Sequence, residues 1–303
     1  MPTCLVLGGA GFIGSHLTDA LARAGHRVRV FDRIRPAARG DCEIVTGDFL
    51  NPADLAKALR GSDFVFHLIS TTLPQASNDN PVHDAETNLL GTLRMLEACR
   101  RERVRKILFV SSGGTVYGIP RSVPITESHP TQPTCAYGIH KLAIEKYLHL
   151  EHLLHGLDYR VLRPANLYGE GQRADLAFGA VTVFLDRALR GEPIRIWGDG
   201  SIVRDYVYVG DAVDAAVNAM AYAGDERIFN IGSGAGTSLN ELVKLIEGAI
   251  GRRIAVEYTP RRAFDVPVNV LDSSLAQRAL GWRAATPLAA GIRKTYESLR
   301  AGH

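Results

Sequence analysis

A tyrosine and a lysine four residues apart could together move a proton. Tyr137 and Lys141 are separated by Gly138-Ile139-His140, and on a helix this spacing places both side chains on one face, one turn apart. A free tyrosine has a pKa of about 10 and is a poor base at neutral pH. An ammonium about 4 Å away is worth roughly 4 kcal/mol at an effective dielectric of about 20, or about three pKa units. The pair could therefore act as a general base with its electrostatic support, although taken alone the two residues are more simply a surface tyrosine and a solvated lysine.

A glycine-rich turn near the N-terminus has the features of a dinucleotide site. The apolar run 3–7 predicts a buried strand, and glycines, a helical apolar pattern over 13–21 and a second strand over 28–31 follow it. Gly8 allows the tight turn, Gly11 lets the backbone approach a pyrophosphate, and Gly14 lets the helix pack closely on the sheet. The free N–H groups at the start of that helix can bind phosphate.

The residue after the second strand favours NAD over NADP. The carboxylate of Asp32 can accept hydrogen bonds from the adenosine ribose diol and would repel a 2′-phosphate. The neighbouring Arg33 is an opposing signal, because an arginine there could bind that phosphate.

Predicted strands and helices alternate through the first half of the chain. Strands at 44–46, 64–68 and 107–110 alternate with helices at 52–59 and 84–100, which predicts an α/β fold with a parallel, doubly wound (Rossmann) sheet. Ligands then bind beyond the carboxyl ends of the strands, so the glycine turn, Asp48, residues 67–70 and residues 111–115 should lie along one edge. His67 ends one strand and is expected to be a packing residue lining the cofactor rather than a catalyst.

The composition argues against several other classes. The chain has 303 residues, 46% of them apolar, a net charge of +3 and dispersed Lys and Arg, so nucleic-acid binding is not expected. No apolar run reaches the ~18–20 residues of a membrane helix, and the N-terminus lacks the features of a signal peptide. The four cysteines have no metal-site or disulfide spacing, which favours a reducing cytoplasm, and no metal is expected.

Several motifs occur in a fixed order. They are Gly8-x-x-Gly11-x-x-Gly14, Asp32, Asn88 within E-T-N-L-L-G-T, the segment Ser111-Ser112-Gly113-Gly114-Thr115-Val116-Tyr117-Gly118, and Tyr137-x-x-x-Lys141. Together they resemble the extended short-chain dehydrogenase/reductase family and, within it, the nucleotide-sugar epimerases of the UDP-galactose 4-epimerase type.

The second half of the chain extends the resemblance. The matching segments are Leu162-Arg163-Pro164-Ala165-Asn166-Leu167-Tyr168-Gly169, Arg204-Asp205-Tyr206-Val207-Tyr208-Val209, Phe229-Asn230-Ile231-Gly232, Arg262-Ala263-Phe264-Asp265-Val266 and Gly281-Trp282. Trp197 lies just before the second of these and is expected to be core rather than a platform for a base.

The resemblance implies NAD as cofactor and a nucleotide sugar, most simply a UDP-sugar, as substrate. The implied cofactor-binding residues are Gly8, Gly11, Phe12, Ile13, Gly14, Asp32, Arg33, Asp48, Phe49, Leu68, Ser70, Asn88, Ser111, Tyr137, Lys141 and Pro164. The implied substrate-binding residues are Asn166, Arg204, Arg262 and Asp265. Two guanidiniums suit a diphosphate because arginine binds phosphate oxygens bidentately. The alternatives are that Arg204 pairs with Asp205 and that Arg262 is a surface residue.

The implied reaction inverts the sugar at C4. Tyr137 would take the proton of the 4-hydroxyl, Lys141 would lower the pKa of Tyr137 and hold the nicotinamide ribose, and NAD would take up and return the hydride through a 4-keto sugar. The family's usual Ser or Thr hydroxyl is replaced here by Gly113. If the segment is extended, Thr115 shares a face with Gly113. We therefore expect Thr115 to substitute, with Ser112 or a water molecule as alternatives.

The same segment separates the predicted reaction from related ones. The 4,6-dehydratases have an Asp-Glu pair and the UDP-glucuronate decarboxylases a Glu at positions occupied here by Gly114 and Thr115, which favours simple epimerisation. Two other hypotheses are a ketosugar reductase of the same fold and a non-catalytic NAD-sensing scaffold.

The resemblance also predicts the arrangement of lobes. A cofactor domain should cover residues 1–165, with roughly 204–231 returning to it, and a smaller C-terminal α/β substrate lobe should cover the rest of 166–303. The helices near 84–100 and 134–155 resemble the pair that forms the family's dimer, so a homodimer is expected.

Overall fold

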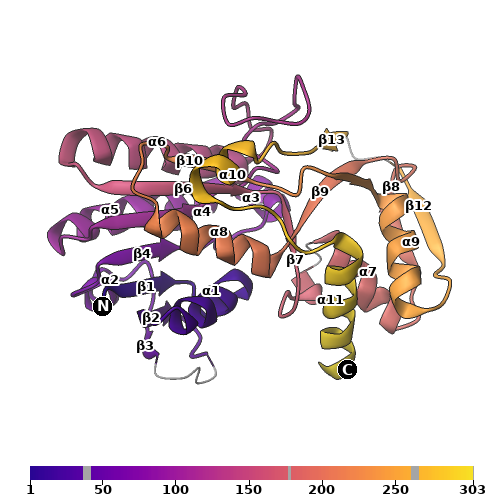
Figure 1. Ribbon diagram of the computed structural model, residues 1–303, viewed down its shortest axis with the longest axis horizontal. Helices are drawn as coiled ribbons and strands as arrows, with labels where there is room; N and C mark the ends of the chain where they lie inside the picture. Colours follow the sequence, from indigo (N-terminus) through magenta and orange to yellow (C-terminus); the bar gives the residue numbers. More distant parts are fainter. Residues whose placement is uncertain (37–41, 177–178, 261–265, 303) are drawn as a thin grey trace.

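The computed structural model describes residues 1–36, 42–176, 179–260 and 266–302 (Figure 1). A parallel sheet of seven strands, in the order β10-β6-β5-β4-β1-β2-β3, forms the larger lobe. This confirms the predicted doubly wound sheet. The strands are β1 (Thr3–Leu7), β2 (Arg27–Asp32), β3 (Glu43–Thr46), β4 (Phe64–His67), β5 (Lys106–Val110), β6 (Asp158–Pro164) and β10 (Ile228–Ile231).

Helices cover both faces of this sheet (Figure 1). One core joins the sheet to α1 (Phe12–Arg23), α8 (Val209–Ala221) and α10 (Ser274–Leu280), and a second joins it to α2 (Pro52–Leu59), α5 (Gly91–Arg101) and α6 (Ala136–His155). Because both faces are covered, the interior strand β1 is buried at all five positions, which explains its continuous apolar sequence.

The smaller lobe is built from the second half of the chain. A four-stranded sheet contains β7 (Asn166–Tyr168), β9 (Val203–Tyr208), β11 (Gly236–Ser238) and β13 (Val268–Asn269), and a separate pair joins β8 (Ile194–Trp197) to β12 (Val256–Thr259). The helices α7 (Ala180–Leu189), α9 (Leu239–Ile250) and α11 (Leu288–Gly302) pack on them. Residues 204–231 were expected to return to the cofactor domain. In the structure α8 packs on the large sheet and β10 is one of its strands, whereas β9 lies in the smaller sheet.

The single helix expected over 84–100 is three consecutive pieces. A short turn, α4 (Pro81–Asp84), runs into the π-helix η1 (Ala85–Leu90) and then into α5, and the short helix α3 (Pro74–Asp79) precedes them. Widened turns of this kind occur often at functional sites. The segment 74–90 therefore has more structure than its sequence pattern suggested, and its elements α3, α4 and η1 all contact α6.

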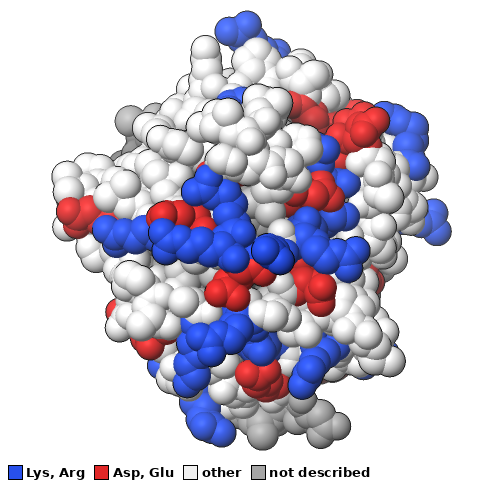
Figure 2. Space-filling view, turned by 90° about the vertical axis from the view of Figure 1, so that its left-hand side faces the viewer, with Lys and Arg blue, Asp and Glu red and all other residues white. Residues whose placement is uncertain are grey.

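One surface expectation needs correction. Trp197 is 47% exposed and is not a core residue. Figure 2 shows a face of the molecule on which Lys and Arg side chains lie with acidic side chains between them. Ion pairs in the described chain include Lys106 with Asp158 at 3.4 Å and Arg100 with Glu151 at 3.6 Å. In the described ranges no helix is long and apolar enough to cross a membrane.

Candidate active site

Tyr137 and Lys141 lie in the first turns of α6, and another segment holds the start of that helix. Cys135, at the N-cap position, makes no side-chain cap. Instead, Ser77 Oγ accepts the backbone N–H of Tyr137 at 2.9 Å, and Asn78 Oδ1 accepts that of Ala136 at 2.9 Å. The orphan donors at the helix start are thus satisfied by α3, which fixes the backbone of Tyr137 from a part of the chain 60 residues away.

The ammonium of Lys141 is buried and lies beside the tyrosine ring. Its Nζ donates to the carbonyl of Val110 at 2.9 Å and lies 5.5 Å from the centre of the Tyr137 ring and 4.7 Å from that of Phe109. Burial lowers the pKa of Lys141 to about 8, against the opposing charges of Asp84 and Glu145.

The expected lowering of the tyrosine pKa by Lys141 is wrong for this structure. Burial raises the pKa of Tyr137 to about 12, and the group that works against this rise is the hydroxyl of Ser70, which hydrogen-bonds to the phenol. The reason is geometric: the ammonium is directed at a backbone carbonyl, and removal of the phenol from water disfavours its charged form.

The segment after β5 is a turn, so the extended conformation on which the choice of Thr115 depended is not present. Residues 113–117 form the turn, and the N–H of Val116 donates to the carbonyl of Ser112 at 3.1 Å. Alternation of side chains therefore does not apply here. Ser112 and Thr115 are three residues apart in a helical type of turn, where such positions are neighbours.

Gly113 has no room for a side chain. A Cβ there would lie 2.5 Å from Cδ1 of Leu271 and 2.9 Å from the carbonyl oxygen of Arg163. At Gly114 the nearest atom to an added Cβ would be Ser112 Oγ, at 3.8 Å, so this side of the turn is open. Thr115 packs against Gly138 of α6, and its hydroxyl is buried with no hydrogen-bond partner among the described residues.

A buried polar network holds the turn and α6 to the sheet. Glu145 accepts hydrogen bonds from Nε and Nη2 of Arg163 at 3.0 and 2.5 Å and from Ser111 Oγ at 2.5 Å. Arg163 also donates to the hydroxyl of Tyr117 at 2.9 Å, and that hydroxyl donates to Asn230 at 2.6 Å. Ser111, expected at the cofactor, thus has its hydroxyl committed to the core.

The glycine turn and Asp32 come together at the start of α1. The Asp32 carboxylate accepts the N–H of Ala10 at 3.0 Å and that of Ile34 at 3.2 Å. A Cβ at Gly14 would lie 2.1 Å from the carbonyl oxygen of Gly8, so only glycine permits this approach of helix and turn. Ile13, Leu68 and Pro164 line a small apolar cavity next to them.

Among the other expected cofactor residues, Phe49 and Asn88 have side chains that contact other residues of the protein. Phe49 is 5% exposed and stacks on His67, whose pKa burial lowers to about 3. His67 thus packs in the core as expected, and its place beside the cofactor stays a prediction. The amide of Asn88 accepts the N–H of Thr71 at 2.9 Å and donates to Asp84 at 2.6 Å. Phe12 lies on α1, whereas Arg33 and Asp48 are exposed.

Two of the four predicted substrate-binding residues lie in the described part of the structure. Asn166 Nδ2 donates to the backbone carbonyl of Asp205 at 3.0 Å, and Arg204 donates to the carbonyl of Val203 at 2.9 Å. Asp205 is fully buried and accepts from Ser233 and from backbone N–H groups, so it is no ion-pair partner of the neighbouring arginine. Arg262 and Asp265 lie outside the described residues.

Sequence and structure comparisons identify the family. The sequence model of the NAD dependent epimerase/dehydratase family matches residues 4–232. The chain is 40% identical to a UDP-glucose 4-epimerase of Mycolicibacterium smegmatis over 98% of both chains. This chain belongs to the NAD dependent epimerase/dehydratase family. Its structure is similar to that of the Thermotoga maritima UDP-glucose 4-epimerase with UDP-glucose, with a TM-score of 0.94, 38% identity and 99% of both chains covered. It is also similar to a Thermus thermophilus UDP-glucose 4-epimerase complex with NAD, with a TM-score of 0.91, 34% identity, and 99% and 100% coverage.

The residues present fit the cofactor that gives this family its name. The N–H groups of residues 8–11 in the turn are bonded within the protein, so the donors that can bind a pyrophosphate are those of the first turn of α1. Asp32 stands beside them, where a ribose diol can be recognised. No cluster of three or more metal-ligating side chains occurs in the described ranges.

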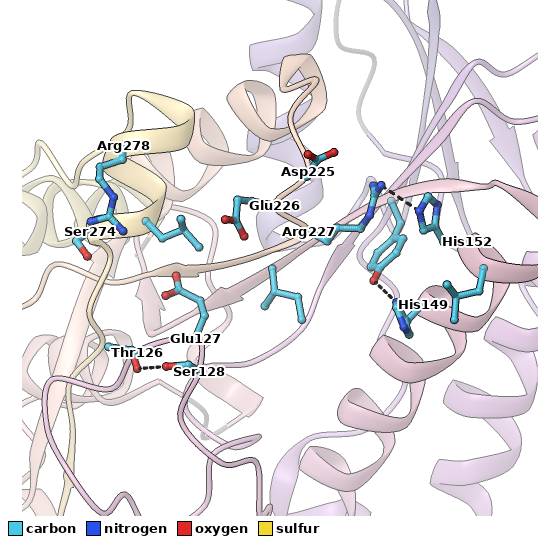
Figure 3. A pocket seen from close by; sticks show the side chains of 14 residues that line it. Thr126, Glu127, Ser128, His149, His152, Asp225, Glu226, Arg227, Ser274 and Arg278 are labelled. Atoms are coloured by element: carbon cyan, nitrogen blue, oxygen red, sulfur yellow. Dashed lines mark hydrogen bonds between the residues drawn. The ribbon is translucent and has the colours of Figure 1, made fainter.

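A larger cavity of about 850 Å³ lies elsewhere, beside the edge strand β10 (Figure 3). Glu127, Arg227 and Arg278 line it together with His149 and His152, and none of the predicted site residues does. Its size therefore does not identify the catalytic site.

Proposed function

We propose that this family member is an NAD-dependent nucleotide-sugar 4-epimerase that acts on a UDP-hexose. The observation that carries the reaction type is the turn facing α6. It offers the hydroxyls of Ser112 and Thr115 and has no carboxylate with which to drive dehydration or decarboxylation. The nearly full-length similarity to UDP-glucose 4-epimerases supports the substrate class.

In the proposed mechanism, Tyr137 removes the proton from the sugar 4-hydroxyl and later returns it. NAD supplies the hydride chemistry when bound. Lys141 provides a fixed positive charge next to the phenol and would hold the nicotinamide ribose. The Ser70 hydroxyl, which is hydrogen-bonded to the phenol, opposes the rise that burial causes in the pKa of Tyr137. The reaction has no net oxidation, because C4 loses and regains a hydride.

We assign the third catalytic role to Thr115, with Ser112 as the alternative. The Thr115 hydroxyl is buried against α6 and has no protein partner in the described chain, so it is available for a substrate oxygen. Ser112 Oγ faces the open side of the turn.

The substrate would lie between the two lobes. Asn166 and Arg204, at the starts of β7 and β9, would contact its phosphates, with Arg262 and Asp265 proposed as their partners on the sequence resemblance. Because arginine binds phosphate oxygens bidentately, these guanidiniums suit a diphosphate.

We also propose a homodimer in a reducing cytoplasm. One face of α6 exposes Ile139, Tyr147, Leu150 and Leu154 by 51%, 39%, 43% and 64%. An apolar stripe of this kind on a helix is typical of a protein interface. None of the four cysteines, all of which lie in the described ranges, forms a disulfide, as expected in a reducing compartment.

The test is incubation of the purified protein with UDP-, GDP- and dTDP-hexoses, followed by NMR of the products. We expect the C4 epimer of a UDP-hexose without added cofactor, and no epimer with Tyr137→Phe. Net absorbance change of the nicotinamide would indicate a reductase, and a biological effect that survives Tyr137→Phe would indicate a scaffold. A 4-keto-6-deoxy product or release of CO₂ would exclude epimerisation as the main reaction.

A further inference from the structure

Asp84 is a buried carboxylate that three separate segments bind. It is 1% exposed. Oδ1 accepts from Thr72 Oγ1 at 2.5 Å and from Asn88 Nδ2 at 2.6 Å, and Oδ2 contacts Nδ1 of His140 at 2.6 Å. These partners come from the loop after β4, from η1 and from α6. A carboxylate removed from water requires donors of this kind or a positive charge to compensate it.

The segments that meet at Asp84 are those that hold the reacting side chains. Thr72 follows Ser70 by two residues, and Ser70 contacts the phenol of Tyr137. His140 lies between Tyr137 and Lys141 on α6. A carboxylate bound by both segments therefore fixes the distance between the Ser70 hydroxyl and the tyrosine.

Two acids, Asp84 and Glu145, act on the charge of Lys141, and they differ in their own partners. Glu145 faces the ammonium from its own helix, but Arg163 neutralises it with two hydrogen bonds. The hydrogen-bond and ion-pair partners of Asp84 in the described chain are Thr72, Asn88 and His140, and none is a lysine or arginine. The remaining groups that face the ammonium are neutral: His67 on β4, the phenol of Tyr137 and the carbonyl of Val110 on β5.

We propose that Asp84 is a positioning residue of the active site, whose carboxylate ties the loop after β4 to α6 and supplies the negative charge that the buried ammonium of Lys141 faces. Its effect on turnover rests on the proposed function. Its effect on Lys141 does not, since that is a property of the protein alone.

Removal of the negative charge of Asp84 should shift the pH profile of turnover in one direction. Asp84 raises the pKa of Lys141 and that of Tyr137. Neutralising it should lower both values. If turnover requires the phenolate of Tyr137 and the ammonium of Lys141, both limbs of the pH profile then move to lower pH. A residue that only supports the fold would reduce turnover without moving the limbs.

The test variant is Asp84→Asn. Asparagine can keep the shape of the network, because its oxygen can accept from Thr72 and Asn88 while its amide donates to the unprotonated nitrogen of His140. Selective ¹³Cε-lysine labelling and NMR would follow the titration of Lys141, assigned by comparison with Lys141→Arg. We expect a pKa of about 8 in the parent and a value lower by about one unit in Asp84→Asn. Glu86→Gln, which removes an exposed acid of the π-helix η1 that follows Asp84, should leave the pKa of Lys141 unchanged.

The second measurement is the pH profile of kcat, where both limbs should shift to lower pH in Asp84→Asn. An unchanged Lys141 pKa, or reduced turnover with unmoved limbs, would overturn the proposal. If Asp84→Asn does not fold, His140→Arg places a permanent cation on the same carboxylate. His140→Arg should also lower the pKa of Lys141. An unchanged pKa of Lys141 in that variant would likewise overturn the proposal. Absence of epimerisation in the parent would count against the proposed function alone.

Discussion

The hydroxyl of Thr115 is buried and has no hydrogen-bond partner in the described chain. An unbonded buried polar group costs about 1–3 kcal/mol of stability, so such a group is expected where function rather than folding retains it. Two other hydroxyls of the same site are engaged: Ser111 donates to Glu145, and Ser70 donates to the carbonyl of Thr72 at 3.1 Å.

Thr115→Val should therefore lower turnover without lowering the stability of the protein. The free energy of unfolding should stay the same or rise by about 1 kcal/mol, because an unpaired hydroxyl is removed at nearly constant volume. Turnover should fall by about tenfold or more if the hydroxyl shares the substrate proton. Ser112→Ala is the matched variant. If neither change lowers kcat tenfold, the third catalytic group is not a side chain of this turn.

Asp32 provides a second prediction for a single residue. Asp32→Ala should weaken NAD binding and reduce the preference for NAD over NADP by roughly tenfold, because a charge-assisted hydrogen bond is worth about 1.5–3 kcal/mol. Equilibrium binding of the two cofactors measures the ratio. Arg33→Ala should leave the ratio unchanged, and a shift toward NAD in that variant would show that the arginine binds the 2′-phosphate.

At the scale of elements, the sequence was most informative where periodicity is regular. The helix Pro52–Leu59 and the strand Thr3–Leu7 have the predicted bounds, because burial on one or both faces leaves a clear pattern. The turn at 113–117 was missed, because two glycines leave no pattern to read. Ser77, Asp84 and His140 were also missed as site residues, since their contacts join parts of the chain more than 50 residues apart.

The packing around this turn also explains why a serine should not be tolerated at Gly113, where the family usually has a hydroxyl. Gly113→Ser should destabilise the protein by about 1–3 kcal/mol, since its Cβ would collide with Leu271, and should not raise turnover. Gly114→Ser enters open space and should change stability by less than about 0.5 kcal/mol. Chemical denaturation of both variants tests this contrast. A stable, faster Gly113→Ser variant would contradict the packing described for the turn.

At the scale of the whole molecule, the proposed site residues come from both lobes. The larger lobe carries the glycine turn, Asp32 and the Tyr137–Lys141 pair of α6, whereas the smaller sheet carries Arg204 and Asn166. The division into lobes was expected from the family resemblance, and of the segment 204–231 the strand β9 departs from it. The exposed stripe on α6 could not be recognised in advance, because its apolar spacing equals that of a core-facing helix.

That stripe makes the oligomeric state testable. The double variant Leu150→Glu/Leu154→Glu should halve the mass measured by sedimentation equilibrium, because four charges would then meet at a two-fold interface. Ile119→Glu, at a site that is 67% exposed in a different segment, should leave the mass unchanged. A monomeric parent protein would rule out the proposed dimer.

The central claim is that one hydride leaves and returns to C4 of a UDP-hexose without leaving the site. UDP-glucose carrying deuterium at C4 tests it directly, with the C4 epimer analysed by NMR and mass spectrometry and no cofactor added. We predict that the epimer keeps the deuterium at C4 and that Tyr137→Phe forms no epimer. Exchange of the deuterium with solvent hydrogen, or failure to form the epimer, would contradict the proposed mechanism.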